Sequence, residues 1–203
     1  MEDPIPIVHI CPNCSAVFVL TEYIPDSASI YKRCLVCRRK LKITPDRVEI
    51  IMTLVQIISG GQTGVDRAGL DAAIEIGLLI GGYVPKGRLA EDGQVPDKYP
   101  MTETGSKNYK DRTKRNVLES DGTLIINIGP MVSGTALTAI IALEHNKPLM
   151  IVQLDQAYQT SVVIDWLDEN RIQILNIAGP RESKRPGIYE QTKMFLLREI
   201  FIR

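Results

Sequence analysis

The pattern of apolar and polar residues changes near residue 50. Beyond that point, apolar runs of strand length are each followed by an amphipathic stretch of helix length. We expect strands at 54–61, 82–84, 123–129, 148–154 and 174–179, and helices at 66–77, 111–120, 133–146, 161–170 and 186–203. Continuous apolar strands that alternate with helices predict an α/β fold, a Rossmann-like, mostly parallel sheet with helices on both faces. We assign residues 50–203 to this domain.

The first segment, residues 1–47, is rich in turns and too short to bury a core of its own. It holds all four cysteines of the chain as two CxxC pairs, Cys11 with Cys14 and Cys34 with Cys37. Two such turns can place four thiolates around one ion in a tetrahedral shell. We therefore expect a structural zinc site in a zinc-ribbon-like knuckle that precedes the α/β domain. Two disulfides or four free thiols are the alternatives.

The overall charge narrows the choice of partner and compartment. Lys and Arg together number 24, as do Asp and Glu, so the formal net charge is zero and no global basic field gathers nucleic acid. The N-terminus has no secretory pattern, and no apolar run approaches the roughly 20 residues that span a bilayer. These features predict a cytoplasmic protein with no membrane contact, where paired cysteines bind metal more often than they form disulfides.

A cluster of cations surrounds the second cysteine pair. Its members are Lys32, Arg33, Arg38, Arg39, Lys40 and Lys42. A zinc ion held by four thiolates carries two net negative charges, which nearby cations offset. We favour this role, and contact of the ribbon with a partner protein or nucleic acid is the alternative.

Three glycine-containing loops follow predicted strands and carry the functional argument. Free backbone N–H groups and the helix dipole at such a corner favour an anion, and glycine lets the backbone approach it closely. The first loop opens the helix at 66–77, and its expected ligand-binding residues are Ser59, Gly60, Gly61, Gln62, Thr63, Gly64, Asp66 and Arg67. The second loop opens the helix at 133–146 and contributes Ser133, Gly134 and Thr135. We expect the two corners to be neighbours in the sheet and to hold one small phosphorylated ligand.

Cations for this ligand are expected from elsewhere in the chain. Arg181 lies in the third loop, residues 178–183, which follows the last predicted strand. It can clamp an oxyanion bidentately, although pairing with Glu182 on the surface is an equal alternative. Lys86 and Arg88 belong to a long polar stretch between residues 85 and 111. For Arg112 and Asn116, the sequence allows either contact with the ligand or a position on a solvated helix face.

Several catalytic classes are excluded by missing motifs. The P-loop pattern GxxxxGK[ST] is absent, as is GxGxxG after the first strand, so neither a Walker-type NTPase nor a standard NAD site is expected. The two histidines, His9 and His145, complete no nucleophile–histidine–acid set. We therefore assign no catalytic residue.

Specific segments of the α/β domain resemble the family of putative molybdenum cofactor carriers, within the superfamily of DNA-processing-protein and lysine-decarboxylase-like Rossmann folds. The matching segments are SGGQTGVDRAGLDAAI (59–74), GGYVPKGRLAEDG (81–93), RTKRNV (112–117), SDGTLI (120–125), SGTALT (133–138), NIAGPRES (176–183) and PGIY (186–189). The resemblance implies a homo-oligomer that binds molybdenum cofactor, or a related phosphorylated pterin or nucleotide, across the first and second loops. The zinc ribbon is not part of the family core.

One departure from the superfamily bears on catalysis. Its nucleoside-monophosphate hydrolases carry a glutamate three residues after a Gly-Thr pair, whereas Thr138 stands at that place after Gly134 and Thr135. Without that carboxylate, binding or carriage is favoured over turnover. Two alternatives remain: a nucleotide-processing hydrolase that uses Asp66, Glu91 or Asp92, and a nucleotide sensor whose zinc ribbon contacts a partner.

Overall fold

The computed structural model describes residues 7–10, 17–20, 30–33, 40–43, 48–50, 54–158 and 160–201. The chain divides into two compact units, residues 1–53 and 54–203. In the first unit, β1 (Ile7–Ile10) pairs with β2 (Val17–Leu20), and β3 (Ile30–Arg33), β4 (Lys40–Ile43) and β5 (Val48–Ile50) form a second sheet, all antiparallel. The four cysteines lie outside the described residues, so the zinc site stays a prediction.

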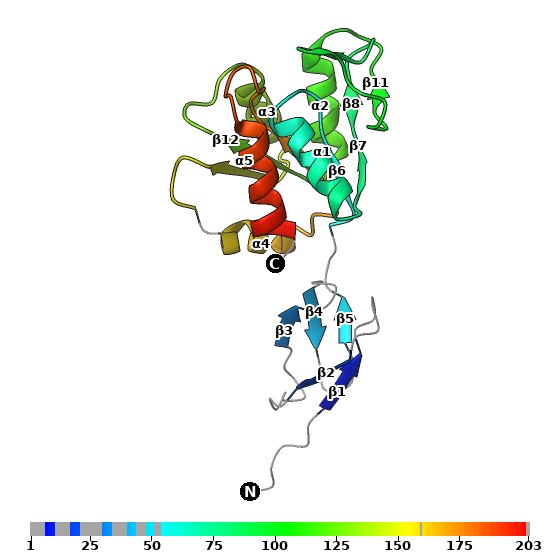
Figure 1. Ribbon diagram of the computed structural model, residues 1–203, viewed down its shortest axis with the longest axis vertical. Coiled ribbons are helices and arrows are strands. Elements are labelled where there is room, and N and C mark those ends of the chain that lie inside the picture. Colours follow the sequence, from blue (N-terminus) through cyan, green and yellow to red (C-terminus); the bar gives the residue numbers. More distant parts are fainter. Residues whose placement is uncertain are drawn as a thin grey trace, which may run out of the picture. The chain divides into compact units, whose positions relative to one another are not determined.

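A five-stranded sheet forms the centre of the second unit (Figure 1). Its strands are β6 (Gln56–Ile58), β7 (Leu79–Gly81), β12 (Gly122–Asn127), β13 (Leu149–Gln153) and β14 (Ile174–Ala178). Their order across the sheet is β13-β12-β14-β6-β7, and every neighbouring pair is parallel. The predicted α/β fold with a mostly parallel sheet is therefore confirmed.

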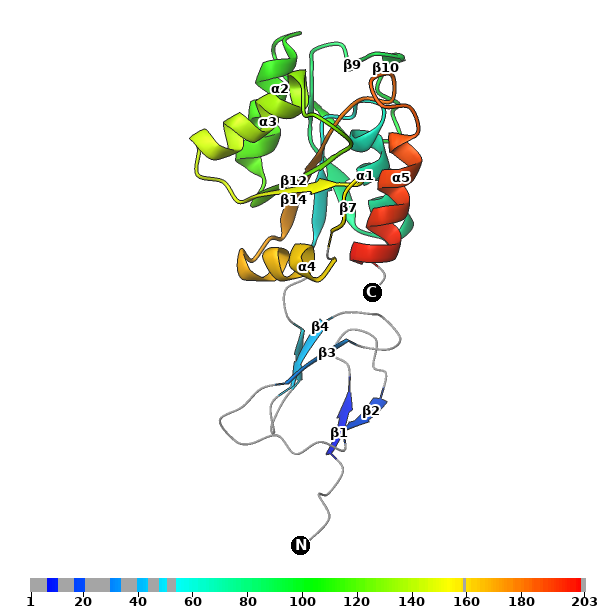
Figure 2. The same ribbon diagram turned by 90° about the vertical axis from the view of Figure 1, so that its left-hand side faces the viewer.

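Helices cover both faces of this sheet (Figure 2). On one face, α1 (Val65–Glu75) packs against α5 (Ile188–Phe195), and on the other α2 (Tyr109–Glu119) packs against α3 (Ser133–Glu144). Every residue of β12 is buried because the strand is covered on both faces and paired on both edges. This burial explains the apolar run at residues 124–126 in the middle of the strand.

The last elements close one end of the second unit. The short helix α4 (Thr160–Glu169) contacts a π-helical turn, η1 (Leu196–Phe201), into which α5 continues. Phe195 and Leu196 at this junction are buried in the core. Within the described parts of the chain, every helix is too short or too polar to cross a bilayer.

The position of the sheet's second strand along the chain differs from the sequence prediction. The edge strand β7 is Leu79–Gly81, three residues earlier than expected, and the predicted segment is β8 (Tyr83–Val84), which pairs with β11 (Thr102–Glu103) instead. Gly82 separates the two because its φ is +126° and a β-carbon there would lie 2.1 Å from the carbonyl oxygen of Ser59. The long polar segment also contains a hairpin, β9 (Leu89–Ala90) and β10 (Gly93–Gln94).

Candidate functional site

The three predicted loops meet at the carboxyl ends of β6, β14 and β12. Because β14 lies between the other two strands, the first and second corners are not neighbours, which corrects the sequence expectation. The third loop, after β14, fills the position between them. Gly64 of the first loop approaches it so closely that a β-carbon would lie 2.5 Å from the carbonyl oxygen of Pro180, and its φ of +76° also favours glycine.

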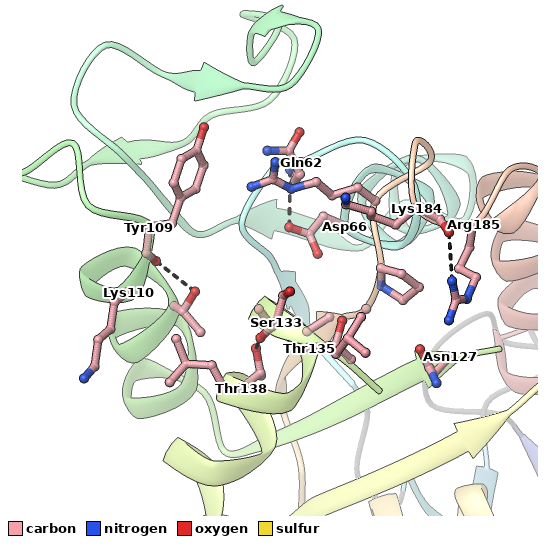
Figure 3. Close-up of a pocket in the computed structure, with 18 of the residues that line it drawn as sticks. Gln62, Asp66, Tyr109, Lys110, Asn127, Ser133, Thr135, Thr138, Lys184 and Arg185 are labelled. Carbon is pink, nitrogen blue, oxygen red and sulfur yellow. Dashed lines mark hydrogen bonds between the residues drawn. The ribbon is translucent and has the colours of Figure 1, made fainter. Parts of the chain in front are cut away.

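A cavity of about 280 Å³ opens where these loops converge with α2 (Figure 3). Six of the predicted ligand-binding residues line it: Gln62, Asp66, Ser133, Gly134, Thr135 and Arg181. Gln62 and Asp66 lie on one side, and Ser133, Thr135 and Thr138 lie on the other (Figure 3). Sequence segments more than a hundred residues apart therefore contribute to one site.

Gln62 is fixed in the first loop by its own side-chain oxygen. Its Oε1 accepts hydrogen bonds from the backbone N–H groups of Thr63 (3.1 Å) and Glu91 (2.9 Å), which sets the orientation of the amide. The side chain is buried, and its Nε2 has no hydrogen-bond partner among the described residues. Buried donors of this kind are rare in folded proteins, so Gln62 Nε2 is a candidate ligand contact.

Asp66 and Arg112 form an ion pair at the same side of the cavity. Arg112 Nη1 lies 3.5 Å from Asp66 Oδ2, which also accepts a hydrogen bond of 3.3 Å from the backbone N–H of Gln62. Burial raises the pKa of Asp66 above its usual range, and the positive charge of Arg112 opposes that rise. Arg112 Nε is buried without a hydrogen-bond partner in the described structure.

Arg112 and Asn116, which the sequence left open, have different roles. Arg112 lines the cavity. Asn116 is buried in the fold, where its Oδ1 accepts from the Tyr83 backbone N–H (2.8 Å) and its Nδ2 donates to the Tyr83 carbonyl oxygen (3.0 Å). Asn116 therefore anchors β8 to α2.

Tyr109, at the start of α2, was not predicted and lines the cavity. The guanidinium carbon of Arg181 lies 5.0 Å from the centre of its ring, and that of Arg112 lies 5.9 Å from it. Both distances fit cation–π contacts. No motif could have revealed Tyr109, because an aromatic residue at a helix start has no specific signature.

The N-terminus of α3 forms the opposite side of the cavity. Helix α3 has no side-chain cap, and Ser133, its first residue, has a φ of +50°. The Thr138 hydroxyl donates to the Gly134 carbonyl oxygen (2.9 Å). The helix dipole and uncapped N–H groups make this end favourable for an anion.

The side chains of Asn127 and Arg185 hold the second loop in place. Asn127 Nδ2 donates to the Gly129 carbonyl oxygen (2.6 Å) and to Gln153 Oε1 (3.0 Å). Arg185, from the third loop, donates to the carbonyl oxygens of Ile128 (2.8 Å) and Pro130 (3.3 Å). These bonds tie the second and third loops together around the α3 N-terminus.

Three predicted cations do not line the cavity. Arg67 makes a bidentate pair with Asp92 (2.5 and 2.8 Å), and its Nε donates to the Gly61 carbonyl oxygen. The Arg88 guanidinium donates to four backbone carbonyls, those of Val95, Pro96, Tyr99 and Met101. Lys86 is exposed. Arg67 and Arg88 therefore shape the polar segment between β8 and α2.

The other predicted residues of the first loop pack or hydrogen-bond within the fold. Ser59 is fully buried and donates to the Ile177 carbonyl oxygen of β14 (2.7 Å). Gly60 lies beneath the guanidinium of Arg112, and Gly61 packs against Val84 and Val95. None of these three, nor Thr63 or Gly64, lines the cavity.

Glu91 connects the first loop, the β9–β10 hairpin and the third loop. Its carboxylate accepts hydrogen bonds from the Thr63 hydroxyl and from the hydroxyl and backbone N–H of Ser183. Partial burial tends to raise the pKa of Glu91, but these hydrogen bonds outweigh it and lower the pKa. With Asp92 held by Arg67, Asp66 is the carboxylate of the three named for catalysis that lines the cavity.

Comparison with known proteins places this chain in a family. The sequence profile of the circularly permutated YpsA SLOG family matches residues 57–200, most of the second unit. The chain belongs to this family. The YpsA SLOG match contains all three loops and α2, and it leaves the cysteine-rich first unit outside.

A solved structure agrees with this membership in the YpsA SLOG family. It is a protein of Syntrophus aciditrophicus named "putative molybdenum carrier protein", with 46% sequence identity and a TM-score of 0.72. The match covers 75% of this chain and 97% of that one. A search of curated proteins finds no match.

Proposed function

We propose that this protein binds a small phosphorylated ligand, molybdenum cofactor or a related phosphorylated pterin or nucleotide, and carries it without chemical change. The observation that supports this most directly is the convergence of three loops on the uncapped N-terminus of α3. Arg181 and Lys184 of the third loop line the same cavity and add positive charge. The similar Syntrophus protein is named a molybdenum carrier, which supports a carrier role here.

A hydrolase remains the second candidate because of Asp66. This carboxylate is buried, lines the cavity and has a raised pKa, which is a common property of an acid or base in catalysis. Two features favour carriage instead. Asp66 is already paired with Arg112. Thr138, which lines the cavity from α3, cannot transfer a proton as a carboxylate would.

The test uses native mass spectrometry of the full chain, followed by identification of any molecule released on denaturation. We expect a phosphorylated pterin or nucleotide to be recovered, and to be recovered intact after prolonged incubation. Recovery of a free base together with a sugar phosphate would favour the hydrolase. A protein with no phosphorylated ligand, and no affinity for added phosphorylated pterin or nucleotide, would contradict both.

Gly134→Asp tests the location of the phosphate. A β-carbon at Gly134 meets no other atom within 4 Å, so the variant should fold, and an acidic residue in the first turn suits the helix dipole. The added carboxylate should repel the phosphate and lower affinity by about tenfold or more. Gly105→Asp is the matched control because Gly105 also has free space around it and lies outside the cavity. Equal affinity in the two variants would remove the α3 end from the site.

A further inference from the structure

The two sides of the cavity suit different parts of a ligand. The buried Asp66 carboxylate lies on one side, and the α3 N-terminus with Ser133 and Thr135 lies on the other (Figure 3). A phosphate is attracted to a helix N-terminus and repelled by a carboxylate. If the proposed function holds, the uncharged part of the ligand therefore lies against Asp66.

Two unpaired donors belong to Gln62 and Arg112, the residues whose other nitrogen atoms contact Asp66. Gln62 Nε2 and Arg112 Nε are both buried, and neither has a hydrogen-bond partner within the described part of the chain. The Gln62 amide cannot satisfy its nitrogen by turning over, because its oxygen already accepts from the N–H groups of Thr63 and Glu91. A ligand group that satisfies these two donors and the Asp66 carboxylate must have both an acceptor oxygen and N–H hydrogens.

We infer that this side of the cavity recognises the 2-amino-4-oxo edge that pterin and guanine rings share. The ring oxygen accepts from Gln62 Nε2 and Arg112 Nε. The adjacent ring N–H and the 2-amino group donate to Asp66, whose bonds to the Gln62 backbone and to Arg112 both end on Oδ2. Adenine has the opposite pattern, with an amino group where the oxygen stands and no ring N–H, so it pairs poorly here.

Apolar side chains also line the cavity. Pro130, Val132, Leu137 and Pro180 supply apolar surface. The Arg181 guanidinium rests on the Tyr109 ring at 5.0 Å, and a guanidinium plane can also stack on a heterocycle. Small-molecule sites commonly combine apolar walls with a few polar groups that set orientation, which is the arrangement seen here.

The inference is tested by calorimetric titration of the full chain with four probes: neopterin 3′-phosphate, guanosine monophosphate (GMP), inosine monophosphate and adenosine monophosphate (AMP). We expect AMP to bind roughly ten to a hundred times more weakly than GMP, because it leaves the buried donors and Asp66 unpaired. Inosine monophosphate, which lacks the 2-amino group, should be intermediate. Comparison of GMP with neopterin 3′-phosphate then distinguishes a guanine ligand from a pterin ligand.

Asp66→Asn tests the assignment of Asp66 by exchanging an acceptor for a donor. We expect the variant to lose affinity for GMP and to gain affinity for xanthosine monophosphate, whose 2-oxo group accepts from the new amide. Asp165→Asn is the control because Asp165 is exposed on α4 and outside the cavity. Gln62→Glu provides a second variant: it keeps the oxygen that Thr63 and Glu91 require and removes the Nε2 donor. It should weaken GMP more than AMP.

Three results would overturn the inference. Equal affinity for GMP and AMP, with both lost in Gly134→Asp, would reject ring recognition and leave the proposed function standing. A larger loss for 2′-deoxy-GMP than for AMP would assign Asp66 to sugar hydroxyls. Failure of all four probes to bind the wild-type chain would reject the proposed function as well.

Discussion

The guanidinium of Arg112 lies directly over the backbone of Gly60. A β-carbon at Gly60 would lie 1.6 Å from Arg112 Nη1 and 2.8 Å from Asp66 Oδ2. The φ of Gly60 is not positive, so glycine is required at this position for space and not for its backbone conformation. The glycine permits the Arg112–Asp66 ion pair, and that pair links α2 to the first loop.

Gly60→Ala should displace Arg112 and weaken binding of neopterin 3′-phosphate or GMP by about tenfold. The cost in unfolding free energy should stay near 1 kcal/mol, because the end of an arginine side chain can move. Calorimetric titration and urea unfolding measure the two effects. Gly105→Ala, with open space around residue 105, is the control. Wild-type affinity in Gly60→Ala would show that the position of Arg112 does not matter for binding.

Asp71 joins α1 to α5 and to the segment before α2. Its Oδ2 accepts from the hydroxyls of Tyr99 (2.9 Å) and Tyr189 (2.8 Å), and its Oδ1 accepts from Lys98 Nζ (2.8 Å). Burial tends to raise the pKa of Asp71, but the bonds from Lys98, Tyr189 and Tyr99 outweigh it and lower the pKa below 3.8. The folded state therefore favours the ionised carboxylate.

This shift predicts how stability depends on pH. Because the folded pKa is the lower one, the contribution of Asp71 is present above about pH 4 and is lost as the pH falls through the folded pKa. Asp71→Asn should lower the unfolding free energy by about 2 kcal/mol near neutral pH, and by less in acid. Urea unfolding of the wild type and of Asp71→Asn, near neutral pH and in acid, measures the loss of unfolding free energy under each condition. Asp165→Asn is the control. A difference that does not change with pH would contradict the assignment.

The cysteine-rich segment leads to a prediction that comes from the sequence alone. We expect one zinc ion per chain, lost on substitution of Cys34 by serine, because three thiolates leave the tetrahedral shell incomplete. Metal analysis by mass spectrometry of the wild type and of Cys34→Ser measures the stoichiometry. Thiol counting in denaturant is the cross-check: four reactive thiols after chelation fit a zinc site, and none would indicate two disulfides.

Much of the fold was predictable because its signals are local. Buried parallel strands such as β12 contain an apolar run, here residues 124–126, and amphipathic periodicity marks helices such as α1. The edge strand β7 was misplaced because Leu79–Gly81 and Tyr83–Val84 are similar short apolar segments. Their separation depends on a contact between Gly82 and Ser59 that local pattern does not contain.

The candidate site was predictable in its backbone and less so in its side chains. Glycine and small hydroxyl residues after a strand identify a loop that can hold an anion, and Ser133, Gly134 and Thr135 do line the cavity. Arginines have no such local signature. No local sequence pattern distinguishes Arg67, Arg88 and Arg112 from one another, but only Arg112 of the three lines the cavity.

The sequence by itself determined the alternation of strands and helices, the three glycine-containing corners and the paired cysteines, because each depends on residues close together in the chain. Only the tertiary structure decided that β14 lies between β6 and β12, and that Arg112 pairs with Asp66 while Arg67 pairs with Asp92. The order of parallel strands and the partner of a long cationic side chain depend on contacts between distant segments. Those contacts form only when the sheet and its helices pack together.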